Sequence, residues 1–283
     1  MRLSISHRTT YSYDGPVDFG LQQLRLTPKS SGAQRVLSWT TTVTGGRREL
    51  CFEDHHANTV ELVSVEPGAR EIEILSQGEL EIEDRAGVHG AHAGHMPLWL
   101  FERQTPLTRP GAGCRRLVAG LTPKMGPLER LHALSRAIRE AVDYRTGSSG
   151  VRSTAEDAIA AGSGVCQDHA HVFVGCARAM GVPARYVSGY LMMEGQVQQD
   201  ASHAWCEICL DPLGWVGFDV SNGLSPDDRY VRVALGLDYA DAAPVHGHRM
   251  GSGMESMNVH LQVAQQPDQT QGQSGQAQQQ TSS

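Results

Sequence analysis

The sequence lacks an apolar run of membrane-spanning length, a positive net charge and the pattern of a signal peptide. No apolar run in its 283 residues approaches the length needed to cross a bilayer. The formal net charge is -7, and an acidic protein is not attracted to nucleic acid or to an anionic membrane. The opening segment MRLSISHRTTYSYDG has no apolar stretch or small-residue cleavage site of a signal peptide. We therefore predict a cytoplasmic protein without a nucleic-acid or membrane partner.

The chain also lacks the cysteine pattern of a zinc or redox protein. Its six cysteines are expected to be free thiols, since no secretion signal precedes them. Cys206 and Cys209 have the CxxC spacing, but no second pair lies nearby, and on a strand they would point to opposite faces. We interpret both as strand residues, with a metal or redox site as the less favoured alternative. An acidic loop of the calcium-binding pattern is missing too. We predict no cofactor and no bound metal.

What is present in the first hundred residues is a series of short strand patterns. Strands are expected near residues 3–13, 22–28, 36–43, 58–65 and 70–83, separated by Gly and Pro turns. In the last of these, apolar residues alternate with glutamates, which predicts one buried and one solvated face. The pattern indicates an antiparallel sandwich over residues 1–95.

A Gly/His/Ala stretch at residues 86–95 then interrupts the strands. It contains His89, His92 and His95, whose spacing allows a metal site if the segment is helical. The interleaved glycines argue against a rigid helix. A flexible linker is therefore the favoured interpretation.

The second half of the chain mixes helices with strands. Apolar residues at helical spacing follow Pro127, and a second helix is expected from Cys166 to Gly181. Strand patterns then cover residues 184–193, 202–210 and 214–221, and a last one covers 258–264.

Cys166 lies where a Gly/Ser loop meets the second predicted helix. A helix N-terminus offers unpaired N–H groups and a partial positive charge, which stabilise a thiolate and the oxyanion of a tetrahedral intermediate. Gly164 would let a substrate backbone come close. Cys176, among apolar residues of the same helix, is expected to be an inert core cysteine.

The base for such a thiol is expected in the following hairpin. A thiol nucleophile needs a base, and the base needs an orienting partner. His203 begins one predicted strand and Asp219 lies near the end of the next. A turn centred on Asp211 would place these two directly opposite each other, with Cβ atoms roughly 5 Å apart. Taken singly, each residue is more often structural; their order and context favour a catalytic role.

Four motifs, in this order, resemble the core of the transglutaminase-like superfamily, particularly its bacterial branch. They are Gly-Val-Cys at 164–166, Ala-Arg-Tyr-Val-Ser-Gly-Tyr at 184–190, His-Ala-Trp at 203–205 and Gly-Trp-Val-Gly-Phe-Asp at 214–219. The resemblance implies that Cys166 is the nucleophile, His203 the base and Asp219 the orienting acid. The segments 3–17 and 21–28 resemble the β-rich domain that precedes this core in the same branch.

The implied fold is α+β. An N-terminal antiparallel β-sandwich-like domain (1–95) precedes a papain-like, transglutaminase-type core (96–263). In the core the nucleophilic cysteine, at a helix N-terminus, packs on an antiparallel sheet. Residues 264–283, rich in Gln and Ser, are expected to be a disordered tail.

The implied reaction is hydrolysis or acyl transfer at a peptide, isopeptide or glutamine amide, through a thioester on Cys166, with a protein or peptide as substrate. Hydrolysis is slightly favoured, because no feature marks a site for an acceptor lysine. Val165 and Gln167 flank the cysteine where animal cross-linking enzymes have Gln and Trp, and calcium activation is not carried over. The alternative is a catalytically silent peptide-binding or scaffold protein of the same fold. The presence of all three triad residues favours the enzyme.

Several neighbours of the triad are candidates for substrate binding. Trp205 and Trp215 flank the hairpin, where they would shield the His–Asp pair, line the acyl cleft or pack in the core. Tyr190 is placed to donate a hydrogen bond into the cleft. Together with Gly164, Trp205 and Tyr190 form the predicted substrate-binding set.

Three polar residues follow Cys166 in its helix. His169 and His171 diverge by about 200° around a helix, so they are not expected to share a metal. Asp168 would oppose a thiolate if it pointed toward it. We expect its carboxylate to point elsewhere.

Overall fold

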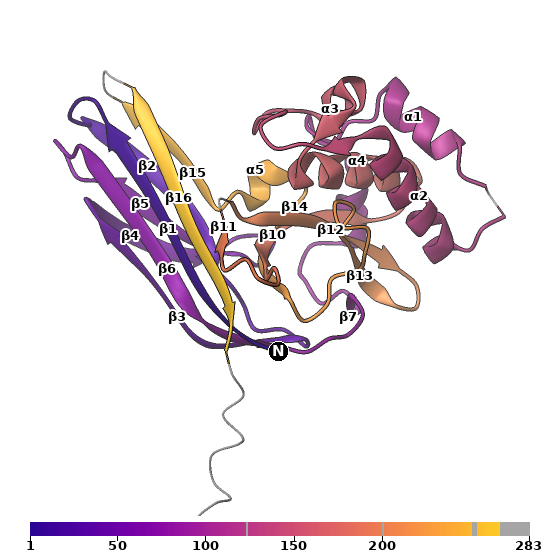
Figure 1. The fold of residues 1–283 in the computed structure, drawn as a ribbon, viewed down its shortest axis with the longest axis horizontal. Coiled ribbons are helices and arrows are strands. Elements are labelled where there is room, and N and C mark those ends of the chain that lie inside the picture. Colours follow the sequence, from indigo (N-terminus) through magenta and orange to yellow (C-terminus); the bar gives the residue numbers. More distant parts are fainter. Residues whose placement is uncertain (123, 200, 251–253, 267–283) are drawn as a thin grey trace, which may run out of the picture.

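The protein has two regions, a β-sandwich and a helix-covered sheet (Figure 1). The computed structural model describes residues 1–122, 124–199, 201–250 and 254–266. The fold contains both helices and sheets, and most of its strand pairs are antiparallel, as the α+β interpretation predicted. Within these ranges no helix combines the length and the apolar character needed to cross a bilayer.

Two antiparallel sheets form the sandwich. One has the order β11-β16-β1-β6-β3, and the other has the order β15-β2-β5-β4. The bounds are β1 Arg2–Tyr13, β2 Phe19–Thr27, β3 Gln34–Thr44, β4 Gly46–Glu53, β5 Thr59–Val65, β6 Glu71–Ile82, β11 Gln198–Gln199, β15 Val245–Met250 and β16 Glu255–Gln265.

The apolar alternation of these strands builds the core of the sandwich. In β6, Ile72, Ile74 and Leu80 are fully buried, while the glutamates between them lie on the other face. Tyr11 of β1 and Val63 of β5 belong to the same buried cluster as the two isoleucines. The predicted sandwich is thus confirmed, because one face of each strand is removed from water.

The second region is built on the sheet β14-β10-β12-β13-β7. Its strands are β7 Val88–Gly90, β10 Ala184–Leu191, β12 His203–Leu210, β13 Gly214–Phe218 and β14 Tyr230–Gly236. The helices are α1 Ala112–Ala119, α2 Pro127–Ala141, α3 Ala155–Ala161, α4 Cys166–Ala179 and α5 Tyr239–Ala242, with a 3-10 turn η1 Leu98–Glu102. A short parallel pair, β8 Asp143–Tyr144 and β9 Ser163–Gly164, precedes α4.

Helix α4 is the central helix of this region. Val172, Phe173, Val174 and Cys176 are fully buried, which confirms Cys176 as a core residue. Packing on β12 and on α1, α2 and α3 surrounds the helix on all sides. Residues on every side of α4 are buried, the polar ones Asp168, His169, His171 and Arg178 included, so the helix lies in the interior of this region.

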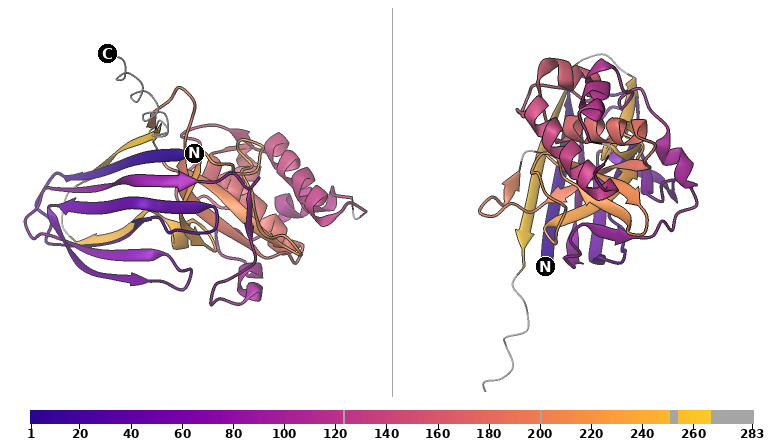
Figure 2. Two further views of the ribbon diagram at one scale, coloured as in Figure 1. Left: turned by 90° about the horizontal axis from the view of Figure 1, so that it is seen from below. Right: turned by 90° about the vertical axis from the view of Figure 1, so that its right-hand side faces the viewer.

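The sheets cut across the division at residues 95 and 263 that the sequence suggested. The predicted last strand exists as β16, but it pairs with β1, from Leu3↔Gln265 to Tyr13↔Glu255. Strand β15 likewise pairs with β2. Figure 2 shows the yellow C-terminal strands lying within the sandwich beside the indigo N-terminal strand. An alternating strand pattern specifies a buried face and leaves the partner strand open.

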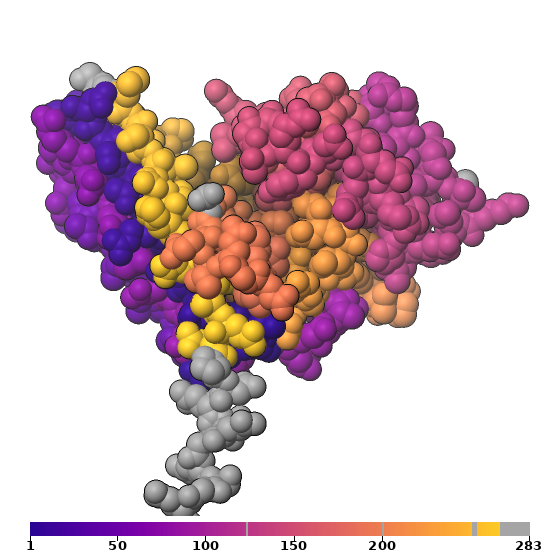
Figure 3. All heavy atoms as spheres, viewed as in Figure 1, coloured from indigo at the N-terminus to yellow at the C-terminus, as the bar shows by residue number. Residues whose placement is uncertain are grey.

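Two further segments cross between the regions. β11, from the core, adds to β16 through Gln198↔Gln262, and the coral segment before it rests against yellow β16 in Figure 3. In the stretch 86–95, Val88 pairs with Val216, so part of the expected flexible linker is strand β7.

The first two residues of the predicted tail, Ala264 and Gln265, belong to β16. The predicted tail from residue 267 on lies outside the described residues.

Candidate active site

The hairpin β12–β13 has a register two residues away from the predicted one. Cys206 pairs with Phe218, and Leu210 with Gly214, so the turn contains three residues and is centred on Pro212. His203 is therefore diagonal to Asp219 rather than directly opposite. A shift of two residues keeps every side chain on the same face. The two side chains still meet.

Asp219 is fully buried and receives three side-chain hydrogen bonds on one oxygen. Its Oδ2 lies 2.6 Å from His203 Nε2, 2.7 Å from Asn222 Nδ2 and 2.7 Å from the Tyr230 hydroxyl. The Asn222 backbone N–H donates to Oδ1 over 3.2 Å. This network fixes the carboxylate and therefore the imidazole that it holds.

The ion-pair environment favours the charged forms of both residues. Burial acts to lower the pKa of His203, but its interactions with Asp219 and Cys166 outweigh burial and raise the pKa to about 10. Burial also acts to raise the pKa of Asp219, and the bonds from His203, Tyr230 and Asn222 outweigh it, so that this pKa is lowered. An imidazolium beside a carboxylate is the stable state at neutral pH.

Two aromatic rings enclose His203. Trp205 stacks on its ring with centroids 6.2 Å apart, and Tyr230 lies 6.0 Å away. Trp205 is itself only 2% exposed. A side chain on Gly189, which pairs with His203 across β10–β12, would collide with the Trp205 ring. Trp205 therefore shields the His–Asp pair rather than lining an open cleft.

Cys166 is the first residue of α4 and is partly exposed. Asp219 occupies Nε2 of His203, and the Cys166 thiol contributes a hydrogen bond to the raised pKa of the same ring. Nδ1 is thus the nitrogen left for the thiol. The backbone N–H groups in the first turn of α4 have no carbonyl partner within the helix. These N–H groups point out of the N-terminal end of the helix, where Cys166 lies.

The loop before Cys166 is shaped by the first turn of α4. Asp168 is buried, and its Oδ2 accepts from the Val165 N–H over 2.7 Å and from the Ser149 hydroxyl. The carboxylate therefore caps its own helix, as expected of an acid that points away from the thiol. Gly164 is buried, and a Cβ there would lie 2.7 Å from Asp168 Cβ. Close packing is the reason for this glycine.

The two histidines of α4 bind separate parts of the protein. His169 contacts the Ser221 hydroxyl and the Val142 carbonyl, each over 2.8 Å. His171 accepts from the Tyr239 N–H over 3.2 Å, and burial lowers its pKa to about 3. Both rings support the structure around α4.

Tyr190 does not lie at this site. Its neighbour Gly189 pairs with His203, and alternation on β10 sends Tyr190 to the other face. There its hydroxyl lies 2.9 Å from His7 Nδ1 of the sandwich, and its ring joins a cluster with Leu3 and Ile5. The prediction of a hydrogen bond into the cleft is wrong for this residue.

Asn222 and Tyr230 were missed in the sequence. Asn222 follows Asp219 by three residues, a spacing typical of a local turn, and this was the signal that could have found it. Tyr230 comes from β14, and no local pattern links it to Asp219. Tyr144 is a third addition: it is 53% exposed, and its pKa is raised by burial and by the neighbouring Cys166 and Asp219.

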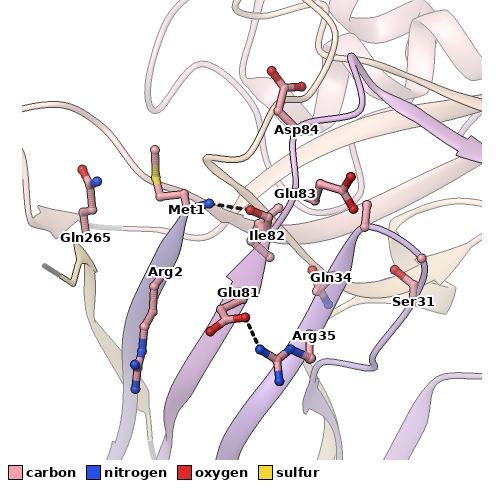
Figure 4. A pocket seen from close by; sticks show the side chains of 12 residues that line it. Met1, Arg2, Ser31, Gln34, Arg35, Glu81, Ile82, Glu83, Asp84 and Gln265 are labelled. Atoms are coloured by element: carbon pink, nitrogen blue, oxygen red, sulfur yellow. Dashed lines mark hydrogen bonds and ion pairs between the residues drawn. The ribbon is translucent and has the colours of Figure 1, made fainter. Parts of the chain in front are cut away.

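A wide hollow of the protein lies away from this site. It has a volume of about 880 Å³ and sits at the end of the sandwich, between the N-terminus and residues 31–35 and 81–84. Figure 4 shows its charged side chains spread apart, with Arg35 bonded to Glu81. None of the predicted triad residues lines it. The site around Cys166 is identified by its geometry rather than by its depth.

These features define a class: an α+β protein in which a helix that begins with cysteine packs on an antiparallel sheet bearing a His–Asp pair. Residues 115–220 match the transglutaminase-like superfamily, and residues 3–81 match the bacterial transglutaminase-like N-terminal region. The chain belongs to this superfamily, in the bacterial form with that N-terminal region.

Similar proteins extend over nearly the whole chain. The uncharacterized protein ML0607 of Mycobacterium leprae is 28% identical over 275 residues, covering 93% of this chain and 98% of its own. The uncharacterized protein Rv2569c of Mycobacterium tuberculosis is 27% identical, covering 87% of each chain. The solved structure of a "Putative Cysteine Protease" from Cytophaga hutchinsonii is 21% identical with a TM-score of 0.77, covering 95% of this chain and 92% of the other. The last similarity shows the fold.

Proposed function

We propose that the protein is a cysteine-dependent hydrolase or acyltransferase that forms a thioester on Cys166. The observation that carries the proposal is the 2.6 Å bond between His203 and the buried Asp219, with the free ring nitrogen left for a thiol at the start of α4. A thiol nucleophile, a base and an orienting acid are the parts that attack on an amide carbonyl requires.

In the proposed reaction His203 holds the thiol proton as an imidazolium, and Cys166 attacks the carbonyl carbon as a thiolate. The oxyanion of the tetrahedral intermediate accepts bonds from the N–H groups at the start of α4. His203 then donates its proton to the leaving amine as the C–N bond breaks, which leaves the thioester. Water or a second amine attacks this thioester, with His203 taking the proton and returning it to the thiol.

Hydrolysis is the favoured branch, with a protein or peptide as substrate in the cytoplasm. Water needs no binding site of its own, whereas transfer needs a site that holds an amine. The structure from Cytophaga hutchinsonii that shares this fold carries the description "Putative Cysteine Protease", which agrees with this branch. Tyr144, exposed beside Cys166, is the side chain best placed to contact the acyl donor.

The test is the rate at which a limiting alkylating reagent modifies each cysteine at pH 6, followed by mass spectrometry. Cys51 is the internal control, because it is an exposed thiol on the edge strand β4. We expect Cys166 to react faster than Cys51, and a His203→Ala variant to lose that advantage. Slow modification of both residues at similar rates would favour the silent peptide-binding protein.

The bond attacked can be identified by trapping. The intact protein is incubated with peptide mixtures, quenched in acid, and searched for an acyl group on Cys166. An acyl adduct that disappears in water supports hydrolysis, and an adduct that persists until an amine is added supports transfer. A Cys166→Ser variant serves as the control, since its hydroxyl is a poor nucleophile with this base.

A further inference from the structure

A second cavity lies between the sandwich and the core sheet. Its volume is about 420 Å³, within the range of sites for small molecules. Residues 29–32 and 56–58 of the sandwich form one wall, and Arg185, Trp215 and Arg232 of the core contribute to the other. Cys166 is not among the residues that line it, so this cavity is separate from the proposed active site.

The walls are held in place by bonds that join the two regions. Gln34 of the sandwich donates from Nε2 to the Arg232 carbonyl over 2.9 Å, and its Oε1 accepts from the Arg232 N–H over 2.9 Å. Asn58 makes the same pair of bonds to Leu235, over 2.7 and 2.8 Å. Strand β14 is thus fixed from the sandwich side. A ligand would find the cavity already formed, which lowers the entropy lost on binding.

The charges in the wall do not balance. Glu207 is fully buried and accepts from Arg185 Nε and Nη2 over 2.8 and 2.5 Å, while Arg232 Nη1 lies 3.3 Å away. Burial lowers the pKa of the adjacent His89, which favours its neutral form. Two guanidinium groups therefore face one carboxylate. Glu207 itself does not line the cavity, and no other carboxylate of the described residues does; Lys29 at the rim is paired with Glu53.

The Arg185 guanidinium uses only part of its donors on Glu207. Arg185 uses Nε and Nη2 on Glu207, which leaves Nη1, and its guanidinium lies over the Trp215 ring at 3.9 Å from the centroid. That contact fixes the plane of the donors. His89 Nε2 also lies 3.3 Å from Glu207 Oε1, so the imidazole lies beside the same carboxylate as the two arginines.

We propose that this cavity binds a small organic monocarboxylate with an apolar or aromatic body. An excess of one positive charge matches one carboxylate better than a phosphate dianion. The planar fork of an arginine suits carboxylate oxygens. Trp215, Val233 and Leu235 line the same space and accept the apolar part. The proposal is independent of the thioester chemistry at Cys166.

The first test is calorimetric titration of the full chain at constant ionic strength with three probes of one shape: benzoate, phenyl phosphate and benzamide. Benzoate is expected to bind more tightly than the other two. Arg232→Gln is expected to weaken benzoate binding about tenfold, since a charge-assisted bond and the charge excess are lost. Arg35→Gln, an exposed arginine of β3 outside this cavity, is the matched control and should bind as the wild type does.

A second variant keeps every charge and removes the space. Ala91 is exposed on the rim of the cavity, and Ala91→Trp should abolish benzoate binding, while Ala119→Trp on exposed α1 should not. Equal binding of benzamide, tighter binding of phenyl phosphate, or benzoate affinity unchanged in both Arg232→Gln and Ala91→Trp would each overturn the proposal. Binding should persist in Cys166→Ala, which separates this site from the proposed reaction.

Discussion

The two regions of the protein use charge in opposite ways. On the sandwich, ion pairs such as Arg8–Glu73 and Arg35–Glu81 lie on the solvated faces of strands. In the core sheet, the carboxylates Glu207 and Asp219 are fully buried and each is surrounded by donors. Exposed pairs contribute little to stability because water screens them. Removing one partner of a buried pair lowers the free energy of unfolding strongly, because it leaves an uncompensated buried charge.

This contrast shows which part of the protein holds its charged side chains in one orientation. The surface pairs join neighbouring strands of the sandwich, as Arg8 of β1 pairs with Glu73 of β6 and Arg35 of β3 with Glu81 of β6. The buried groups hold side chains in one orientation, which is what a site requires. Both buried carboxylates belong to the β12–β13 hairpin region. Glu207 lies on β12, four residues after His203, which is the partner of Asp219. One serves the proposed active site, and the other the proposed carboxylate site.

The largest effect is expected from breaking the buried cluster. Arg185→Met leaves Glu207 in a dry environment with weaker partners, and we expect the free energy of unfolding to fall by about 3–5 kcal/mol. Urea denaturation followed by tryptophan fluorescence measures this loss. Arg35→Met on the sandwich is the control and should leave the midpoint unchanged. Similar losses in both variants would remove the distinction between the two regions.

The next effect concerns the buried pair at the proposed active site. Asp219→Asn keeps the shape but removes the charge that stabilises the His203 imidazolium. We expect the alkylation rate of Cys166 at pH 6 to fall by about tenfold or more, since one pKa unit corresponds to a tenfold change in population. Asp227→Asn is the control, because Asp227 pairs with Arg229 on the surface. An unchanged rate in Asp219→Asn would count against the triad.

The same pair predicts how stability depends on pH. The pKa of His203 rises from about 6.5 in the unfolded chain to about 10 in the folded protein, so the folded state binds the proton more tightly. The stabilisation is complete below pH 6.5 and is lost as the pH rises through 10. The slope of the unfolding free energy in this window is expected to reach about -1.4 kcal/mol per pH unit.

Denaturation midpoints between pH 6 and pH 10 measure that slope. A His203→Gln variant cannot bind the proton and should show a flatter dependence over the same window. If wild type and variant lose stability in parallel, the titrating group is another one.

Local patterns in the sequence predicted much of this architecture. The alternation in residues 70–83 gave the buried face of β6, and the Gly/Ser loop before Cys166 located the start of α4. The pairing of His203 with Asp219 was anticipated because a hairpin brings its two strands together whatever the sequence of its turn. These features depend on residues close in the chain, where periodicity and turn chemistry decide the structure.

Contacts between distant segments could not be predicted in the same way. The register of β12–β13 was misplaced by two residues, because the loop length was not encoded in the turn signal Asp211–Gly214. Tyr230 reaches Asp219 from another strand, and β16 returns to β1 across the whole chain. An alternating strand specifies which face is buried but not which edge accepts it. Tyr190 was misplaced because every residue of β10 is buried, so the sequence does not show which of its side chains lie on the face of His203.

The smallest effect separates two buried tyrosines whose hydroxyls have different partners. Tyr190→Phe removes the bond to His7 in the sandwich interface, and Tyr230→Phe removes the bond to Asp219. Each loss of one hydroxyl is expected to cost about 1 kcal/mol in unfolding free energy. Only Tyr230→Phe should also slow the alkylation of Cys166, because only Tyr230 acts on the His–Asp pair. A slower reaction in Tyr190→Phe would return that residue to the site from which its position on β10 removes it.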